Sequence, residues 1–201
     1  MKKIKIRMAK EQDAEKLLQI YAPYILNTAV TFEYEVPTVE EFRKRIHNIK
    51  IDYPYIVCEE GSEIIGYAYA HKMYERAAYQ WNAELSIYMK ENYTGHGIGT
   101  SMYSVLLQIL KLQNVQNVFG CVTTPNEKSE RLHKKMGFIT SGVFHKTGFK
   151  LGEWHDITWF EKTIGERSGH VSPLRSIQEI AEDRINKILE RENEKIKDRV
   201  N

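Results

Sequence analysis

The chain has 201 residues, 42% of them hydrophobic and 28% charged, which is typical of one well-packed globular domain with a short appendage. Its formal net charge of +2 gives no sign of the clustered basic face that nucleic-acid binding requires. Charges interrupt the first ten residues, unlike a signal peptide, and no run approaches the roughly 18 apolar residues that span a bilayer. We therefore expect a cytoplasmic protein that binds neither nucleic acid nor membrane.

The hydrophobic pattern changes repeatedly between the period of strands and that of helices. A helix start is indicated at Thr38, where Glu41 stands at capping-box spacing. In chain order the sequence predicts a strand within residues 1–10, helices over 11–27 and from 38, strands over 53–59, 64–73 and 82–90, a helix over 98–110, a strand over 115–122, a helix over 127–136, and strands over 139–146 and 155–162. Helices interleaved with mostly antiparallel strands predict an α+β fold, with one parallel pair in the middle of the sheet.

The last part of the chain differs in character. Residues 165–171 are typical of a linker, and from Ser172 onward the pattern predicts a charged helix, with Ser176 and Glu179 at capping-box spacing. From residue 165 the chain has eight Lys or Arg and eight Asp or Glu, so it is neutral overall. We divide the chain into a main domain over 1–164 and an extension over 165–201. The helix either folds against its own domain or contacts a second subunit or another partner.

Cysteines and histidines show no pattern of a metal site. Cys58 and Cys121 each lie in an apolar, strand-like run, which predicts buried thiols. The histidines show no metal-ligand spacing, and none is paired with a cysteine. We expect no metal ion.

A glycine-rich turn, Gly95, Gly97 and Gly99, lies between a predicted strand and a predicted helix. A helix N-terminus carries unpaired N–H groups and partial positive charge, and glycines let a phosphate approach them closely. No Lys-Ser/Thr pair follows the last glycine, so the turn is not a Walker loop. The residues alone leave two interpretations, a tight connection or an anion site.

Residues 84–138 resemble the core of the GNAT superfamily of acetyltransferases. Residues 94–99 resemble its pyrophosphate loop, except that Thr94 replaces the usual Gln or Arg, and residues 126–138 match its pattern Asn-x-x-Ser-x-x-Leu-x-x-x-x-Gly-Phe. The resemblance implies the GNAT fold and acetyl-CoA as acetyl donor, with the pantetheine arm along the strand before the loop. It implies these cofactor-binding residues: Ile87, Tyr88, Met89, Thr94, Gly95, His96, Gly97, Ile98, Gly99, Thr100, Asn126 and Ser129.

Several separate segments are similar to the phosphinothricin acetyltransferase branch of that superfamily. They are Ala78-Tyr79-Gln80-Trp81-Asn82-Ala83-Glu84, Arg131-Leu132-His133 and Gly152-Glu153-Trp154-His155-Asp156, within a resemblance that covers about residues 3–162. This implies an N-acetyltransferase acting on a small amino-acid-like amine of the phosphinothricin, methionine sulfone or sulfoximine type, and commonly a homodimer. Alternatives are acetylation of an antibiotic, a polyamine or a protein, or a non-catalytic acetyl-CoA-binding protein.

Two residues are candidates for the proton transfers. Glu84 lies on the polar face of its strand, and the resemblance implies that it is the general base, acting through water; otherwise it is a surface carboxylate. His133 stands where many GNAT enzymes have a tyrosine, and could protonate the leaving thiolate or could simply pack. We single out four residues for contact with the substrate: Phe32, Arg76, Tyr79 and Trp154. For each of them an ordinary structural role is the alternative.

Overall fold

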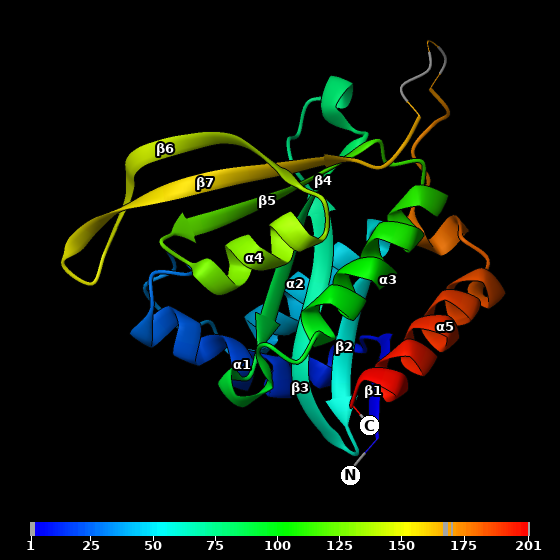
Figure 1. The fold of residues 1–201 in the computed structure, drawn as a ribbon, viewed down its shortest axis with the longest axis horizontal. Helices are drawn as coiled ribbons and strands as arrows, with labels where there is room; N and C mark the ends of the chain where they lie inside the picture. Colours follow the sequence, from blue (N-terminus) through cyan, green and yellow to red (C-terminus); the bar gives the residue numbers. More distant parts are fainter. Residues whose placement is uncertain (1–2, 167–168, 170, 201) are drawn as a thin grey trace.

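The computed structural model describes every residue except 1, 2, 167, 168, 170 and 201 (Figure 1). Residues 167, 168 and 170 of the predicted linker therefore lie outside the described residues. The strands are β1 (Ile4–Met8), β2 (Tyr55–Glu60), β3 (Glu63–Lys72), β4 (Asn82–Met89), β5 (Asn117–Thr124), β6 (Ile139–Lys150) and β7 (Glu153–Thr163). The helices are α1 (Ala14–Asn27), α2 (Val39–Asp52), α3 (Ile98–Leu112), α4 (Glu127–Lys135) and α5 (Glu182–Val200).

The strands form one seven-stranded sheet in the order β1-β2-β3-β4-β5-β7-β6. Every neighbouring pair is antiparallel except β4 with β5, which are parallel. The predicted α+β fold and its single parallel pair are thus confirmed. Strands β6 and β7 run further than predicted, up to a tight turn in which Leu151 and Gly152 have φ of 53° and 86°.

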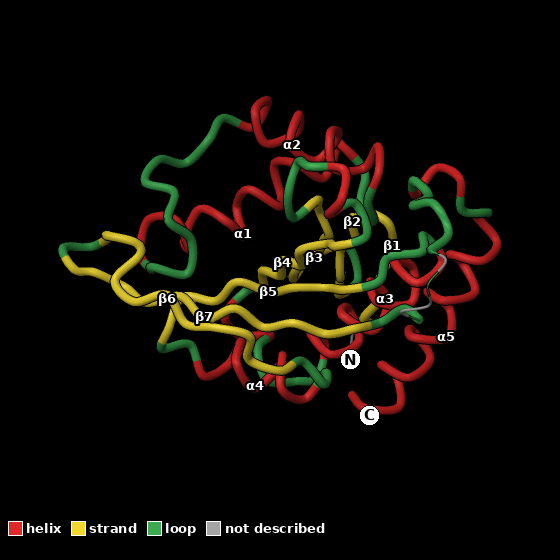
Figure 2. The backbone as a smooth tube through the Cα atoms, turned by 90° about the horizontal axis from the view of Figure 1, so that it is seen from above, coloured by secondary structure: helices red, strands yellow, loops and turns green. Residues whose placement is uncertain are grey.

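Helices cover both faces of the sheet. Figure 2 shows α1 and α2 on one face and α3, α4 and α5 on the other. The alternation along β3 matches these two layers, because Ala68 and Ala70 pack into the core that contains α3, whereas Tyr67 packs into the core of α1 and α2. The rings of Tyr69 and His71 continue the Tyr67 side of the strand.

The parallel pairing of β4 with β5 is short. It ends where Glu84 stands opposite Phe119. Beyond that point β4 keeps its pairing with β3 as far as Met89, and β5 keeps its pairing with β7 as far as Thr124. The two strands therefore separate next to Glu84, which leaves one backbone edge of each without a strand partner.

The start of α2 is the predicted capping box. The Thr38 hydroxyl accepts from the Glu41 amide at 3.2 Å, and the Glu41 carboxylate accepts from the Thr38 amide at 2.7 Å. A cap of this kind stabilises a helix by about 1 kcal/mol. The second predicted box, Ser176 with Glu179, opens a short 3₁₀ turn instead, and α5 begins later, at Glu182. The helix start expected near Ser172 is therefore wrong.

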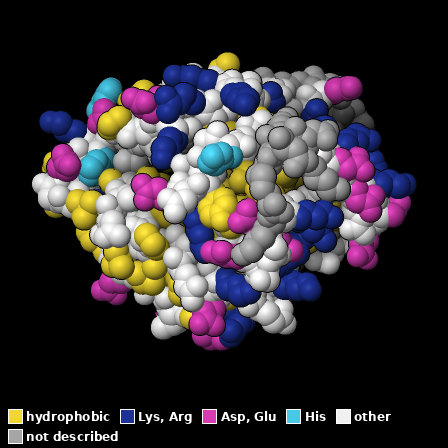
Figure 3. Space-filling view, turned by 60° about the horizontal axis from the view of Figure 1, so that its bottom comes forward, with side chains coloured by type: hydrophobic (Ala, Val, Ile, Leu, Met, Phe, Trp, Pro, Cys, Tyr) yellow, Lys and Arg dark blue, Asp and Glu magenta, His cyan; other side chains and the backbone are white. Residues whose placement is uncertain are grey.

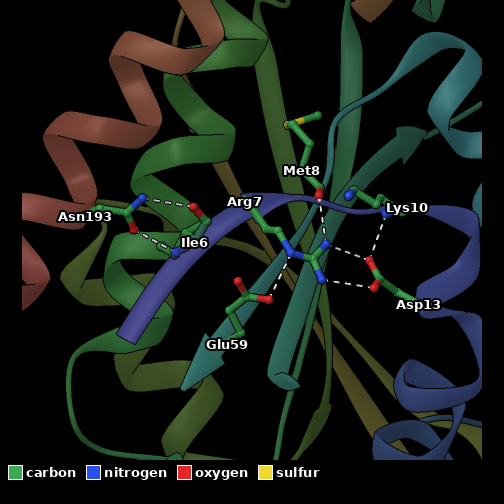
Figure 4. A network of polar contacts seen from close by, with 7 residues as sticks. All are labelled: Ile6, Arg7, Met8, Lys10, Asp13, Glu59 and Asn193. Atoms are coloured by element: carbon green, nitrogen blue, oxygen red, sulfur yellow. Dashed lines mark hydrogen bonds and ion pairs between the residues drawn. The ribbon is translucent and has the colours of Figure 1, made fainter. Parts of the chain in front are cut away.

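The C-terminal helix folds against its own domain, the first of the two alternatives. It lies beside α3 and β1 and buries Ile185, Leu189 and Ile196 in the main core. Its Asn193 side chain accepts from the Ile6 amide at 2.6 Å and donates to the Ile6 carbonyl at 2.9 Å (Figure 4). These two bonds occupy the edge of β1 in the way that a neighbouring strand would.

The prediction that both cysteines are buried is right for Cys58 and wrong for Cys121. Gly120 and Val122 of β5 face the covered side of the sheet, so Cys121 between them faces the opposite side. There α1 and α2 lie over β2, β3 and β4, so they leave this part of β5 open. The open face is next to Glu84, which stands opposite the neighbouring Phe119.

The outer surface carries charges of both signs. On the face drawn in Figure 3, Lys and Arg are interspersed with Asp and Glu. Within the described part of the chain, no helix is long and apolar enough to cross a membrane. Among the same residues, His, Cys, Asp and Glu form no group of three or more that could hold a metal ion.

Candidate active site

A cavity of about 710 Å³ opens where β4 and β5 separate. Its walls come from α1, the end of β4, the glycine turn, the start of α3, and α4. Nine of the residues predicted to bind the cofactor line it: Ile87, Met89, Thr94, Gly95, Gly97, Gly99, Thr100, Asn126 and Ser129. Three do not, because Ile98 is buried in the core, His96 is exposed, and the Tyr88 ring packs against Tyr21 and Tyr24 on the other face of the sheet.

The glycine turn has the backbone conformation that only glycine adopts easily. Gly95 and Gly97 have φ of 89° and 77°, and Gly97 is the N-cap of α3. The first amides of α3 have no partner within the helix, and the helix dipole places partial positive charge there. At Gly99 an added Cβ would be in ordinary contact, at 3.4 Å, with the side chains of Ile87 and Leu132.

Basic side chains surround the same turn. Lys128 of α4 donates to the Thr94 hydroxyl at 3.0 Å, and that hydroxyl donates to the Glu91 carbonyl at 2.9 Å. The other cations on the wall are Lys90, Arg131 and Lys135. Helix amides, glycines and several cations together suit a ligand that carries several phosphate groups.

The exposed edge of β4 is partly occupied. The Tyr24 hydroxyl donates to the Met89 carbonyl at 2.6 Å and accepts from its amide at 3.4 Å. Strand alternation turns the backbone of Ile87 to the same side. The pairing of β4 with β5 ends at Glu84, before Ile87. A pantetheine arm lying along this edge could therefore bond to the backbone of Ile87 without rearrangement, whereas a bond to the backbone of Met89 requires Tyr24 to move.

Asn126 serves the structure of α4 as its N-cap. Its side chain accepts from the Ser129 amide at 3.2 Å, and its own amide donates to Glu130 at 3.2 Å. The cap fixes the helix that carries Lys128 and Ser129 on the wall of the cavity.

Glu84 lies at the point where the two strands separate, with its side chain 20% exposed. Burial raises its pKa, and the nearby His71, with Nε2 3.9 Å from Oε2, partly offsets that effect. Its charge also reaches the buried Tyr103 hydroxyl, whose pKa is raised mainly by burial and then by Glu84. A half-buried carboxylate with a raised pKa is suited to accept a proton at neutral pH.

His133 is buried, with 2% of its surface exposed. Its Nδ1 donates to the Ser129 carbonyl at 2.9 Å, which leaves Nε2 to accept from the Tyr103 hydroxyl at 3.3 Å. The ring stacks on Phe160 at 5.0 Å and lies so close to β5 that a Cβ on Gly120 would be 2.2 Å from Nε2. Burial lowers the pKa of His133, so the imidazole is held neutral with both nitrogens engaged.

Phe32 and Trp154, two of the residues singled out for the substrate, pack in different places. Phe32 packs over Gly148, where an added Cβ would be 2.2 Å from the ring, and its centroid is 6.3 Å from that of His155. Trp154 is 58% exposed and packs on Phe149 at 5.3 Å. Successive residues of a strand face opposite sides, so His155 rather than Trp154 shares a side with Phe32.

Arg76 and Tyr79 lie in the loop before β4. Tyr79 is the last residue of a short 3₁₀ turn (Ala77–Tyr79), and Arg76 directly precedes that turn. Arg76 is exposed, and the ring of Tyr79 packs against Tyr74 at 5.0 Å. The walls of the donor cavity, and those of a second cavity behind α2, include none of the four residues singled out for the substrate: Phe32, Arg76, Tyr79 and Trp154.

A second cavity, of about 390 Å³, lies between α2 and the aromatic side of β3. Residues that sequence reasoning did not single out line it: Tyr21, Glu33, Phe42, Arg45, Asn48, Ile49, Tyr55, Tyr67, Tyr69 and His71. The alternation Tyr67-Ala68-Tyr69-Ala70-His71 could have placed His71 on the aromatic side of its strand. The position of His71 directly opposite Glu84 depends on the register of β3 with β4. The sequence of the loop between these two strands does not reveal that register.

Comparison with known proteins identifies the family. Residues 6–159 match the family described as the acetyltransferase (GNAT) domain. The chain belongs to the GNAT family.

Named relatives lie within one part of that family. The chain is 29% identical to the phosphinothricin N-acetyltransferase of Streptomyces viridochromogenes, over 88% of this chain and 96% of that one. It is 25% identical to the L-methionine sulfoximine/L-methionine sulfone acetyltransferase of Salmonella typhimurium, over 84% and 97%. Among solved structures it is similar to the phosphinothricin acetyltransferase of Sinorhizobium meliloti in complex with acetyl-CoA, with a TM-score of 0.80, 29% identity and coverage of 87% and 98%.

The protein is therefore an acetyl-CoA-dependent N-acetyltransferase of the GNAT type, and acetyl-CoA is its acetyl donor. The cavity at the β4–β5 separation fits that donor in its chemistry. The turn around Gly97 and the cations beside it suit the phosphates, and the free edge at Ile87 suits an amide-containing arm.

Proposed function

We propose that this GNAT protein acetylates the amino group of a small amino-acid-like substrate of the phosphinothricin, methionine sulfone or methionine sulfoximine type. The observation that carries the proposal is the position of Glu84, a half-buried carboxylate at the separation of β4 and β5, on the face that α1 and α2 leave open beside it. The names of the relatives support the class of amine.

Glu84 is the general base in this proposal and acts through a water molecule. Acetyl-CoA, when bound, supplies an activated acetyl group whose carbonyl carbon reacts only with an uncharged amine. An ordinary glutamate, of pKa about 4.3, faces an α-amino group of about 8, a gap of roughly 5 kcal/mol. Burial raises the pKa of Glu84 and so narrows this gap.

We infer that His133 holds other groups in place instead of donating a proton itself. Both of its ring nitrogens are already bonded, and its ring fills the space between Phe160, Phe138 and Tyr103. This arrangement supports a role in fixing the Tyr103 hydroxyl near Glu84. We assign no general acid.

The cofactor and substrate residues follow the same proposal. The nine predicted residues on the cavity wall hold the donor, together with Lys128. Phe32 contributes to the acceptor side from its place over β6, and Trp154, Arg76 and Tyr79 approach it from the open face or from a second subunit.

We also propose a cytoplasmic homodimer, in which residues 1–164 carry the reaction and residues 165–201 support the fold. Strand β6 is the edge of the sheet and leaves apolar side chains exposed on and near it: Ile139, Val143, Phe144, Phe149, Leu151 and Trp154. Such a surface is typical of a subunit contact. Light scattering after size-exclusion chromatography tests the dimer, and a concentration-independent monomer would contradict it.

A substrate panel tests the proposed function. Thiol release from acetyl-CoA would be followed with phosphinothricin, methionine sulfone, methionine sulfoximine, ordinary amino acids, a polyamine and an aminoglycoside. We expect turnover with the amino-acid analogues and not with the polycations. Turnover of a polycation alone would replace the substrate class, and binding of acetyl-CoA without any turnover would favour a non-catalytic protein.

A further inference from the structure

His71 and Glu84 form a cross-strand pair that the reaction as described so far does not use. They stand directly opposite each other in the β3–β4 ladder. Directly opposed residues on one face of an antiparallel pair bring their Cβ atoms within about 5 Å. In this pair the Nε2 atom of His71 is 3.9 Å from a Glu84 oxygen.

A backbone contact fixes which His71 nitrogen carries hydrogen. Nδ1 lies 3.0 Å from the carbonyl oxygen of Lys72. A carbonyl oxygen only accepts, so Nδ1 is the protonated nitrogen and Nε2 keeps its lone pair. The lone pair is therefore on the nitrogen that is near Glu84.

We propose that His71 takes from Glu84 the proton that Glu84 has removed from the substrate amine, and releases it to solvent. The proposal rests on Glu84 being the base, as argued above. First an N–H bond of the ammonium breaks and its electron pair stays on nitrogen. The proton goes to the bridging water, which gives one of its own protons to Glu84, so that an O–H bond forms on the carboxylate. Then that O–H bond breaks and an N–H bond forms at His71 Nε2. The imidazolium finally gives this proton to water, so Glu84 and His71 both return to their starting states.

The surroundings of His71 suit a route to solvent. Its side chain is 34% exposed and lines the second cavity, and its ring is 5.8 Å from that of Tyr69. Glu84 on β4 faces His71 directly. The other titratable and charged groups around His71 line the second cavity: Tyr67 and Tyr69 on β3, Tyr55 on β2, Tyr21 on α1, Glu33 before α2, and Arg45 on α2. Glu33 and Arg45 are paired at 2.8 Å, so they add little net charge.

The pair also reduces the energetic problem of deprotonating an ammonium. Imidazole is in general a stronger base than a carboxylate, so it is closer in basicity to the amine that must lose the proton. The 3.9 Å separation is too long for a direct hydrogen bond, so the transfer requires a side-chain rotation or one bridging water.

The test compares His71→Gln with His47→Gln, since His47 is an exposed histidine on α2 that pairs with Glu11. We expect kcat for the amine to fall about 10- to 100-fold in His71→Gln at pH 7.5. The affinity for acetyl-CoA should not change, and His47→Gln should behave like the wild type. The acidic limb of the pH–rate profile should move to higher pH in His71→Gln, because His71, once protonated, lowers the pKa of Glu84 and glutamine cannot do so.

A measurement on the protein without acetyl-CoA separates this proposal from the proposed function. In NMR spectra of the labelled protein, His71 should be protonated at Nδ1, its Nε2 resonance should shift in Glu84→Gln, and the Glu84 carboxyl should titrate at higher pH in His71→Gln. The proposal would be overturned if His71 were protonated at Nε2 instead of Nδ1. It would also be overturned if the Glu84 carboxyl titrated at the same pH in the wild type and in His71→Gln. If the spectra agree with the pairing but Glu84→Gln keeps the wild-type rate, Glu84 is not the base and the proton route through His71 is wrong. The contact between His71 and Glu84 would still stand.

Discussion

Lys128 and Thr94 are joined across the mouth of the donor cavity, with the ammonium 3.0 Å from the hydroxyl. One residue comes from α4 and the other from the turn before α3. Thr94 stands where the resemblance to GNAT enzymes leads one to expect Gln or Arg. The bond shows that a cation from another helix reaches this position, so the turn is not left without a side-chain donor.

Replacing Lys128 with alanine should weaken acetyl-CoA binding about fivefold, which is about 1 kcal/mol for one partly exposed charge contact. Lys134→Ala is the matched control, because Lys134 lies on the same helix but pairs with Glu130 away from the cavity. Isothermal titration with acetyl-CoA checks both variants. Equal affinities in the two variants would contradict the role given to Lys128.

Replacing His133 with asparagine should change how stability depends on pH. Burial lowers the pKa of His133 below that of an unfolded histidine, so the unfolded chain binds more protons below about pH 6.5. The wild type should therefore lose stability as the pH falls from 7.5 to 5.5, and the variant should lose less. At pH 7.5 the variant should be about 2–3 kcal/mol less stable, from the cavity it leaves.

Urea unfolding at both pH values measures these differences, with the exposed His47→Asn as control. An identical pH dependence in wild type and His133→Asn would show that His133 titrates as it does in the unfolded chain. That result would return it to the candidates for a general acid.

Replacing Glu84 with glutamine should raise the melting temperature at pH 7.5. Burial makes the pKa of Glu84 higher in the folded protein than in the unfolded chain. The stability that this group contributes is therefore present at pH values below its unfolded pKa, and it is lost as the pH rises through its folded pKa. A neutral amide avoids that loss. Differential scanning calorimetry should show the gain at pH 7.5 and not near pH 4, and an exposed control, Glu190→Gln, should show no gain. A lower melting temperature at pH 7.5 would contradict this explanation.

Replacing Asn193 with alanine should destabilise the protein by about 1–3 kcal/mol. The change removes both bonds to the backbone of Ile6 and leaves the edge of β1 without those partners. Asn186→Ala, at an exposed position of the same helix, should stay within about 0.5 kcal/mol of the wild type. Urea unfolding checks both, and equal stabilities would mean that α5 does not hold the β1 edge.

Much of the fold could be predicted because local patterns carry it. The alternation around Glu84 predicted β4, the capping box at Thr38 predicted the start of α2, and the glycines before Ile98 predicted the turn into α3. What local patterns could not supply is register and tertiary packing. The pairing of His71 with Glu84, the burial of His133 and the reach of Lys128 each join segments far apart in the chain.

The same reason explains the wrong expectations. Cys121 lies in an apolar run, but only the placement of α1 and α2 decides which face of β5 is covered. The spacing of Ser176 and Glu179 is that of a helix start, yet Ile177 and Ile180 are held in the core and the turn ends there.

Whether Glu84 is the base is decided by the rate of acetyl transfer by Glu84→Gln at saturating acetyl-CoA, with an amino-acid analogue from the panel as acceptor. We expect a fall of about 10²- to 10⁴-fold with unchanged affinity for acetyl-CoA, because a positioned base contributes that much to a proton transfer. A variant that acetylates the amine at the wild-type rate would contradict this role of Glu84.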